Sequence, residues 1–106
     1  NTSGGVTGIG DSPPVELALH PGVPSPFSQS TRFDYELPAS DHVRLHVYDV
    51  TGRRIRTLVD ENRSAGRYGA FWDGRDDGGQ RVASGVYYIR METRAEMKRQ
   101  KVVLLR

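Results

Sequence analysis

Apolar and polar residues alternate along most of this chain, and this pattern constrains the fold more than any other feature. Between residues 31 and 37 the apolar side chains Phe33, Tyr35 and Leu37 are separated by charged ones, and the same period recurs over 15–19 and 42–47. A period of two places alternate side chains on opposite faces of a strand with one buried face. No window of about 11 residues carries an apolar stripe at helical spacing. The pattern therefore predicts an all-β fold.

Turn residues divide the alternating pattern into short segments. We expect seven strands, at about 15–19, 31–37, 42–49, 54–59, 67–73, 85–92 and 97–105. Residues 60–66 are expected to form a longer loop, and 73–80 a tight, glycine-rich connection. Short strands with turns at intervals of roughly 8–12 residues are typical of a sandwich or barrel. Seven strands favour an immunoglobulin-like β-sandwich of two packed antiparallel sheets.

The inward-facing positions of these strands define the expected core. Trp72, the single tryptophan, is the predicted centre because aromatic rings dominate core energetics. The other members are Leu17, Leu19, Phe33, Tyr35, Leu37, Val43, Leu45, Val47, Ile55, Leu58, Tyr68, Ala70, Tyr87, Ile89, Met91 and two or three residues of 102–105.

A change of composition separates the start of the chain from the rest. Residues 1–14 contain four glycines and two prolines, with only Val6 and Ile9 as sizeable apolar side chains. Such a segment cannot offset its ordering entropy by burial. We expect 1–14 to be a flexible Gly/Ser/Pro linker and 15–106 to be one sandwich domain. The 106 residues leave no room for a second domain, and the linker-like start without methionine suggests a fragment of a longer polypeptide.

Residues that could carry out catalysis are scarce. The chain has no cysteine, and none of its serines lies in a Gly-x-Ser-x-Gly elbow. His42 and His46 are four residues apart, which on a strand separates them by roughly 13 Å, too far to share a metal ion. We expect both to be exposed strand side chains. The sequence therefore predicts a protein that is not an enzyme.

An acidic loop gives the one weak indication of a metal. Asp73, Asp76 and Asp77 crowd together, but Arg75 stands where an EF-hand loop needs an oxygen ligand. The simpler interpretation is that these carboxylates accept hydrogen bonds from nearby backbone amides and fix the turns. A weak Ca²⁺ site at these three residues is the alternative. No other cofactor is expected.

The charge balance argues against nucleic acid and membrane partners. Lys and Arg number 15 and Asp and Glu 13, a net charge of +2, and the two signs are interleaved. Such interleaving is typical of a solvated protein surface. No apolar run approaches the ~20 residues that span a bilayer, so we expect no direct membrane insertion.

Four segments together carry a family resemblance. They are Pro24-Ser25-Pro26-Phe27 with the following residues to Pro38, the hairpin 47–58, the stretch 65–88 around Trp72-Asp73-Gly74, and the terminal 101–106. In order and spacing they resemble the type A C-terminal sorting domains of type IX secretion, over about residues 18–106. The segment around Trp72 also resembles the immunoglobulin-like domain of flagellar hook-capping proteins. Ser25 departs from the pattern, since the family usually has asparagine there. The resemblance assigns structural signatures to Pro26, Phe27, Gly52, Trp72, Asp73, Gly74, Gly85 and Tyr87.

The resemblance implies a targeting role without catalysis. Such a domain directs an upstream cargo in the same polypeptide across the outer membrane to the cell surface or medium, after transit through the periplasm. Its partner would be the outer-membrane translocon or a receptor component of it. The residues expected to be read are Lys101, Val102, Val103, Leu104, Leu105 and Arg106.

Two alternatives stay open. One is a structural or adhesive immunoglobulin-like module of a surface or hook-cap-like assembly. The other, less favoured, is a carbohydrate-binding module that would use the outward-facing rings of Tyr48 and Tyr88.

Overall fold

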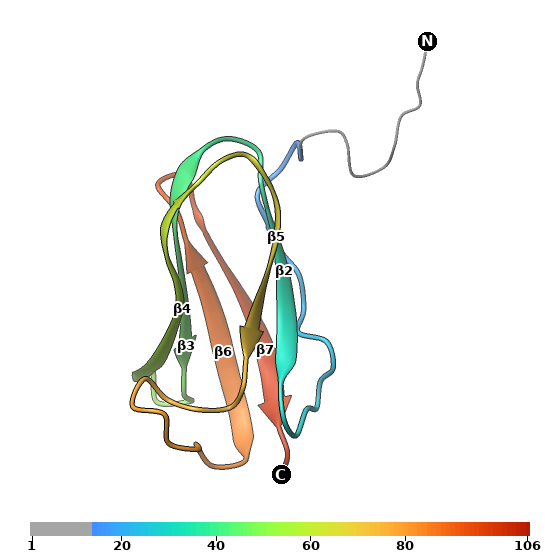
Figure 1. Cartoon of the computed structure of the whole chain (residues 1–106), viewed down its shortest axis with the longest axis vertical. Helices are drawn as coiled ribbons and strands as arrows, with labels where there is room; N and C mark the ends of the chain where they lie inside the picture. Colours follow the sequence, from blue (N-terminus) through green and yellow to red (C-terminus); the bar gives the residue numbers. More distant parts are fainter. Residues whose placement is uncertain (1–13) are drawn as a thin grey trace.

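The expected alternation folds into two antiparallel sheets packed face to face. The computed structural model describes residues 14–106, and that part of the chain contains strands and turns but no helix (Figure 1). A three-stranded sheet has the order β1-β2-β5 and a four-stranded sheet the order β4-β3-β6-β7. The strands are β1 (Ala18–Leu19), β2 (Thr31–Leu37), β3 (Asp41–Tyr48), β4 (Arg54–Arg63), β5 (Gly66–Trp72), β6 (Gly85–Glu92) and β7 (Met97–Leu104). The prediction of a seven-stranded immunoglobulin-like sandwich is confirmed.

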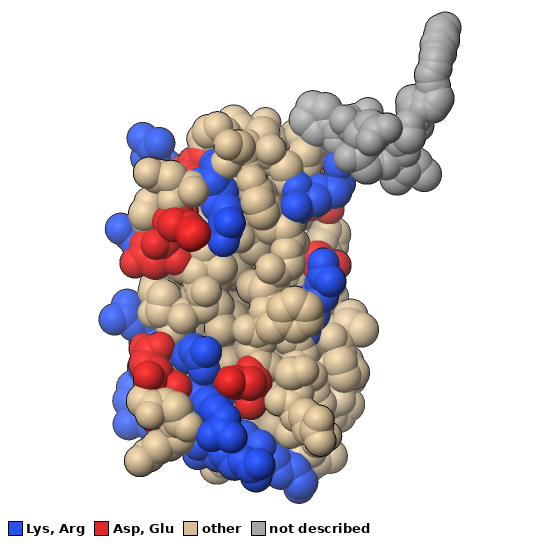
Figure 2. Space-filling model, in the orientation of Figure 1, with Lys and Arg blue, Asp and Glu red and all other residues tan. Residues whose placement is uncertain are grey.

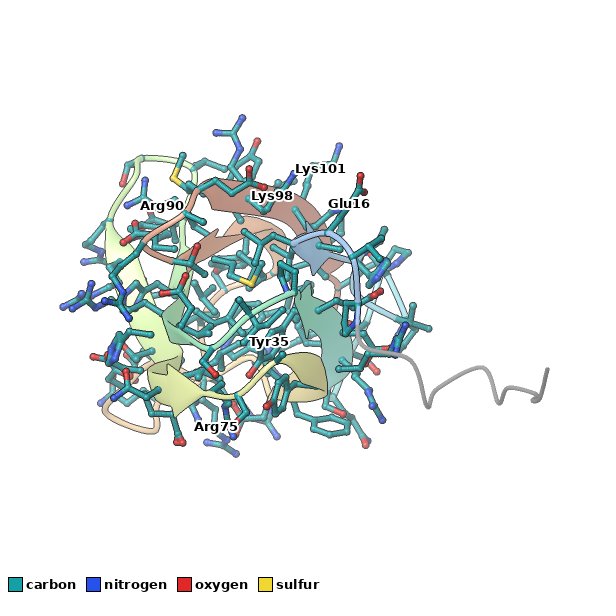
Figure 3. All side chains as sticks on the ribbon, turned by 90° about the horizontal axis from the view of Figure 1, so that it is seen from above. Glu16, Tyr35, Arg75, Arg90, Lys98 and Lys101 are labelled. Atoms are coloured by element: carbon teal, nitrogen blue, oxygen red, sulfur yellow. The ribbon has the colours of Figure 1, made fainter. Side chains whose placement is uncertain are left out.

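The core lies between the sheets and is made by the alternate residues that the pattern selects. Phe33, Tyr35 and Leu37 of β2 are buried, as are Val43, Leu45 and Val47 of β3. Seen along the long axis, Tyr35 lies between the two sheets (Figure 3). Trp72 is fully buried, with the rings of Phe27 and Tyr87 packed against it at centroid distances of 5.4 and 5.1 Å. Its Nε1 donates a hydrogen bond to the carbonyl of Arg75 at 2.9 Å, so its one polar atom is satisfied.

Two expected element boundaries are wrong. The first strand comprises Ala18 and Leu19 only, opposite Glu36 and Tyr35 of β2, instead of 15–19. The fourth strand continues to Arg63, so residues 60–63 belong to a strand and not to a loop. They pair with the start of β3, from Asp41 to Arg44. This part of β4 lies at a sheet edge and is largely exposed, so its run of polar residues shows no alternation.

Four expectations about burial also fail. Leu17 and Tyr68, expected in the core, are only partly buried. The other two failures lie along the β3–β4 pair. The pairing register shifts between Leu45 and His46 and again between Val47 and Tyr48. A bulge changes which residues of a strand face inward. Val59 is buried in place of Leu58, which is only partly covered. His46, expected to be exposed, is 4% exposed, because Thr57 and the ring of Tyr48 cover it.

The predicted linker lies outside the described residues, apart from Pro14, and so stays a prediction. No helix in the described part of the chain has the length and apolar character needed to cross a membrane.

Candidate functional site

The last strand, β7, forms one edge of the four-stranded sheet and contains the start of the predicted targeting segment. It pairs with β6 from Gly85↔Leu104 to Glu92↔Met97. The backbone of Val103 faces away from β6, since its N–H donates to Ser25 Oγ at 3.2 Å and its carbonyl accepts from the N–H of Phe27 at 2.9 Å. By alternation the backbone groups of Arg99 and Lys101 also face outward. In the described part of the chain no second strand pairs with them.

A short segment covers the far end of this edge. We call Ser25–Phe27 the strap. Besides its bond to Val103, its Phe27 carbonyl accepts from the N–H of Leu105 at 2.8 Å, which makes a parallel bridge between Phe27 and Leu104. The ring of Phe27 is 3% exposed and covers the end of the sandwich next to Trp72. The outer edge of β7 is therefore closed at 103–105. At 97–101 it is open, in the sense that no backbone group of residues 14–106 pairs with it there.

The six predicted targeting residues divide between core and surface. Val102 and Leu104 are fully buried, and Val103 is partly buried. Lys101, Leu105 and Arg106 are exposed, and Lys101 lies on the outer side of the sheet (Figure 3). The structure thus brings the six together in one strand end, but only three of them present most of their side chain to solvent.

The signature glycines lie at turns around the same end. Gly74 has φ +73°, and a Cβ there would lie 2.7 Å from Nη2 of Arg106, which donates to the Gly74 carbonyl at 2.7 Å. Gly52, with φ +89°, closes the β3–β4 turn by donating to the carbonyl of Asp49 at 3.0 Å. Left-handed backbone of this kind favours glycine. Gly85 begins β6, and the hydroxyl of Tyr87 donates to the carbonyl of Ala83 at 2.6 Å.

The acidic loop uses its carboxylates to hold backbone. Oδ1 of Asp73 accepts from the N–H of Arg75 at 3.1 Å and also pairs with Nη1 of Arg56 at 3.0 Å. Oδ1 of Asp76 accepts from the Gln80 N–H and Oδ1 of Asp77 from the Thr57 N–H, at 2.9 and 3.0 Å. Among the described residues, no group of three or more acidic or histidine side chains is placed to hold a metal ion. Ca²⁺ binding at Asp73, Asp76 and Asp77 stays a prediction that these contacts do not favour.

Tyr48 and Tyr88 lie opposite one another across β3 and β6 and line a depression of about 350 Å³. Their ring faces are covered by arginines. Cζ of Arg90 lies 4.4 Å from the ring centroid of Tyr48, and Cζ of Arg99 lies 5.4 Å from that of Tyr88. Sugar-binding platforms need bare ring faces, so this surface is a poor one for carbohydrate.

The imidazoles differ in electrostatics as well as in exposure. Burial lowers the pKa of His46 below its usual value. The pKa of His42 is raised instead, because its Nε2 lies 2.6 Å from the carboxylate of Asp60 and its Nδ1 2.9 Å from the amide oxygen of Asn62. Neither ring lies beside a serine or cysteine nucleophile, so the arrangement offers no acid–base chemistry of the triad type.

These features define an immunoglobulin-like module with one partly open sheet edge. The family model described as the FlgD Ig-like domain matches residues 25–96, which is more than half of the chain. The chain therefore belongs to the FlgD Ig-like domain family, whose members are non-catalytic structural domains. A comparison with curated proteins finds no match.

Solved structures with the same fold include bacterial proteins of two kinds. FlgD from P. aeruginosa has a TM-score of 0.56 at 25% identity, over 70% of this chain and 58% of that one. Dimeric latent PorU from Porphyromonas gingivalis has a TM-score of 0.65 at 18% sequence identity, and the match covers 84% of this chain and 9% of PorU. PorZ of the same organism is described as an essential bacterial surface component of the type-IX secretion system. It has a TM-score of 0.53 at 20% sequence identity, and the match covers 85% of this chain and 11% of PorZ. The chain spans less than two thirds of each of them, and the likeness to PorU and PorZ shows the fold alone.

Sequence reasoning did not find the pairing of the strap with β7 or a group of three arginines at the same end. The strap is signalled only by Pro24 and Pro26 around Ser25, because proline favours extended backbone in the residue before it. Nothing in the sequence indicates which strand the segment lies against.

Proposed function

We propose that this domain is a non-catalytic targeting module that directs an upstream cargo in the same polypeptide through type IX secretion. The cargo passes from the periplasm to the cell surface or medium, and the partner is the outer-membrane translocon or a receptor component of it. The observation that carries the proposal is the open outer edge of β7 at residues 97–101. The motif resemblance over residues 18–106 and the fold shared with PorZ support the same assignment.

An open edge can be recognised by strand addition. An incoming extended segment would hydrogen-bond to the outward-facing backbone of Arg99 and Lys101, and main-chain bonds of this kind supply affinity without demanding one sequence. The side chains of Arg99 and Lys101 are exposed and take part in none of the ion pairs of the described residues. They would favour an acidic partner strand over a second copy of this basic one.

The strap restricts the proposed contact to the first part of β7. The strap occupies the backbone edge at 103–105, so a partner strand would have to displace Phe27 in order to pair there. Val102 and Leu104 are fully buried, so removing 101–106 would damage the core as well as any signal. We therefore assign the contact with the receptor to 97–101, with Lys101 as the residue shared with the predicted targeting segment.

A backbone-blocking variant tests this assignment without removing the core. The whole chain would be fused behind a signal peptide and a fluorescent reporter in a type IX-competent host. Arg99→Pro removes an outward-facing N–H, a position where proline is tolerated at a sheet edge. Arg99→Gln is the matched control, because it removes the charge and keeps the N–H. Circular dichroism of the purified domains would verify that both variants fold.

We expect the wild-type and Arg99→Gln fusions to reach the surface or medium and the Arg99→Pro fusion to stay in the periplasm. Export of all three would exclude strand addition at this edge while leaving the targeting role in place. Retention of the wild-type fusion in the periplasm, with the domain folded, would contradict the targeting role itself.

A structural or adhesive module is the second candidate, and the family assignment favours it. FlgD from P. aeruginosa, at 25% identity, shares the fold over 70% of this chain. This function predicts that the isolated domain associates with itself or with another subunit. Light scattering after gel filtration measures self-association directly, and a monomer at all concentrations would count against self-assembly. The covered rings of Tyr48 and Tyr88 make carbohydrate binding the weakest of the three functions.

A further inference from the structure

A basic pocket lies at the end of the sandwich where the chain leaves β7. It has a volume of about 410 Å³ and is lined by Ser28, Gln29, Asp73, Arg75, Arg81 and Arg106. In the space-filling view, Lys and Arg side chains gather at this end of the molecule (Figure 2). The described chain begins at the opposite end of the sandwich (Figure 1).

Two of the three arginines are held side by side by the backbone. Arg75 and Arg81 form an isolated antiparallel bridge, which places their side chains on the same face. Like charges directly opposite one another in such a pair are unfavourable. The small hairpin between them is fixed by hydrogen bonds from the Asp76 N–H to the Gln80 carbonyl at 2.9 Å and from the Gly79 N–H to the Asp76 carbonyl at 3.0 Å. The chain therefore builds a rigid turn that holds two cations together.

The third arginine comes from the end of β7. The guanidinium of Arg106 donates through Nη2 to the Gly74 carbonyl at 2.7 Å and through Nε to the Val82 carbonyl at 3.3 Å. Arg75 similarly donates through Nη1 to the carbonyl of Gly79 at 2.8 Å. A guanidinium has five N–H donors, so each of these side chains is oriented by carbonyls and keeps further donors.

The one acidic side chain in the pocket lining forms no ion pair with these three cations. None of the ion pairs of the described residues includes Arg75, Arg81 or Arg106. Asp73, the single acid of the lining, pairs with Arg56, which lies outside the lining. Three positive charges thus face one carboxylate that is already paired.

We propose that this pocket binds an oxyanion of the phosphate class. Guanidinium forks match the oxygens of phosphate two at a time, and the hydroxyl of Ser28 and the amide of Gln29 add uncharged donors. A doubly charged anion compensates three arginines better than a single carboxylate does. The volume falls in the range of sites that hold small molecules, roughly 300–1,000 Å³, so the phosphate is carried by a larger molecule. The proposal does not depend on the secretion role.

Calorimetric titration of the purified chain with inorganic phosphate and with glycerol phosphate tests this directly. Arg81→Gln removes one pocket cation whose side chain is exposed and takes part in none of the ion pairs of the described residues. Arg94→Gln is the matched control, because it removes the same charge from the turn between β6 and β7. That turn lies at the end of the β6–β7 hairpin opposite the pocket. We expect saturable binding that Arg81→Gln weakens about tenfold or more, the effect of losing one charge-assisted hydrogen bond. Arg94→Gln should change the affinity by less than about twofold, an effect of net charge that salt screens.

Sedimentation with phosphatidic acid vesicles separates the two sources of the anion. Sedimentation of the wild type but not of Arg81→Gln identifies a lipid headgroup, whereas binding of glycerol phosphate without sedimentation identifies a soluble ligand. Three results would overturn the proposal: no saturable binding by the wild type, equal weakening by Arg81→Gln and Arg94→Gln, or succinate binding as tightly as phosphate.

Discussion

Replacing Phe27 by alanine should remove a large part of the stability of this domain, although Phe27 lies outside every strand. The ring is 3% exposed and packs on Trp72. Burying a phenylalanine side chain contributes about 1.5–3 kcal/mol by transfer from water alone. The cavity left behind at a rigid end of the sandwich raises the expected loss to about 3–5 kcal/mol. Alanine keeps both main-chain hydrogen bonds of the strap to β7, so the loss reports the ring alone.

Phe71→Ala is the matched control, because it removes the same side chain from a largely exposed position in β5. Phe71 is 63% exposed, so it buries roughly a third as much surface as Phe27. Its replacement should lower the free energy of unfolding by about 1 kcal/mol or less. Its contact with the Arg32 guanidinium, 5.4 Å from the ring centroid, adds no more than about 0.5–1 kcal/mol at an exposed site.

Urea unfolding followed by the fluorescence of Trp72, the single tryptophan, measures both losses. The Phe27→Ala variant should also unfold thermally at least ~12 °C below the wild type, because 1 kcal/mol corresponds to roughly 4–8 °C in a domain of this size. A loss below about 1.5 kcal/mol for Phe27→Ala, or equal losses for the two variants, would refute the conclusion that the strap completes the core.

Three further outcomes are expected. Burial lowers the pKa of His46 in the folded protein, so at a pH below the ordinary value of about 6.5 the unfolded chain binds one proton more than the folded chain. Stability should therefore fall as the pH drops from about 7 toward 5. His46→Gln should flatten this part of a plot of the urea midpoint against pH. Asp49→Ala should lower the urea midpoint at neutral pH, because the Asp49 carboxylate accepts from the hydroxyl and N–H of Thr51 at 2.6 and 2.9 Å. The hydroxyl bond is the largest cause that lowers the pKa of Asp49, followed by the bond from the Arg53 N–H. The contribution of Asp49 to stability is therefore present above about pH 4, and the two proteins should converge as the pH falls through the folded-state pKa. Gly74→Ala should cost more than Gly52→Ala in chemical denaturation, since both have positive φ, worth about 1–2 kcal/mol, but only at Gly74 does a Cβ meet the Arg106 side chain.

The strands and most of the core could be predicted because their cause is local. Each strand with one buried face repeats an apolar residue every second position, and β2 and β3 do so without interruption up to His46. Strands that lack this local cause cannot be located from the alternation. The end of β4 is polar on both faces and continues as a strand only because β3 lies beside it. The bulges after Leu45 and Val47 likewise depend on how two strands meet, and they explain the errors at Leu58 and His46.

The candidate sites could be predicted less well because they are assembled from distant segments. Phe27 and Leu104 are separated by most of the chain, and no spacing within either segment indicates that they pair. The pocket arginines come from a hairpin and from the end of β7, and each appears in the sequence as one basic residue among many. The acidic loop was the more visible motif, yet its carboxylates are occupied by backbone amides.

The way in which β7 is covered limits how this edge can be used. An unprotected edge strand tends to pair with further copies of itself, and proteins prevent this with charge or by covering the edge. Here the strap covers the more apolar end, 103–105. The open stretch 97–101 carries Arg99 and Lys101, and also Lys98, which pairs with Glu96. A second copy would bring the same positive charges against them and would be repelled, whereas an acidic strand would not. On the proposed function, charge disfavours pairing of this edge with a second copy and favours a partner strand of opposite sign. A peptide rich in Asp and Glu should protect the amides of Arg99 and Lys101 from hydrogen exchange, and protection by an equally long basic peptide would contradict this argument.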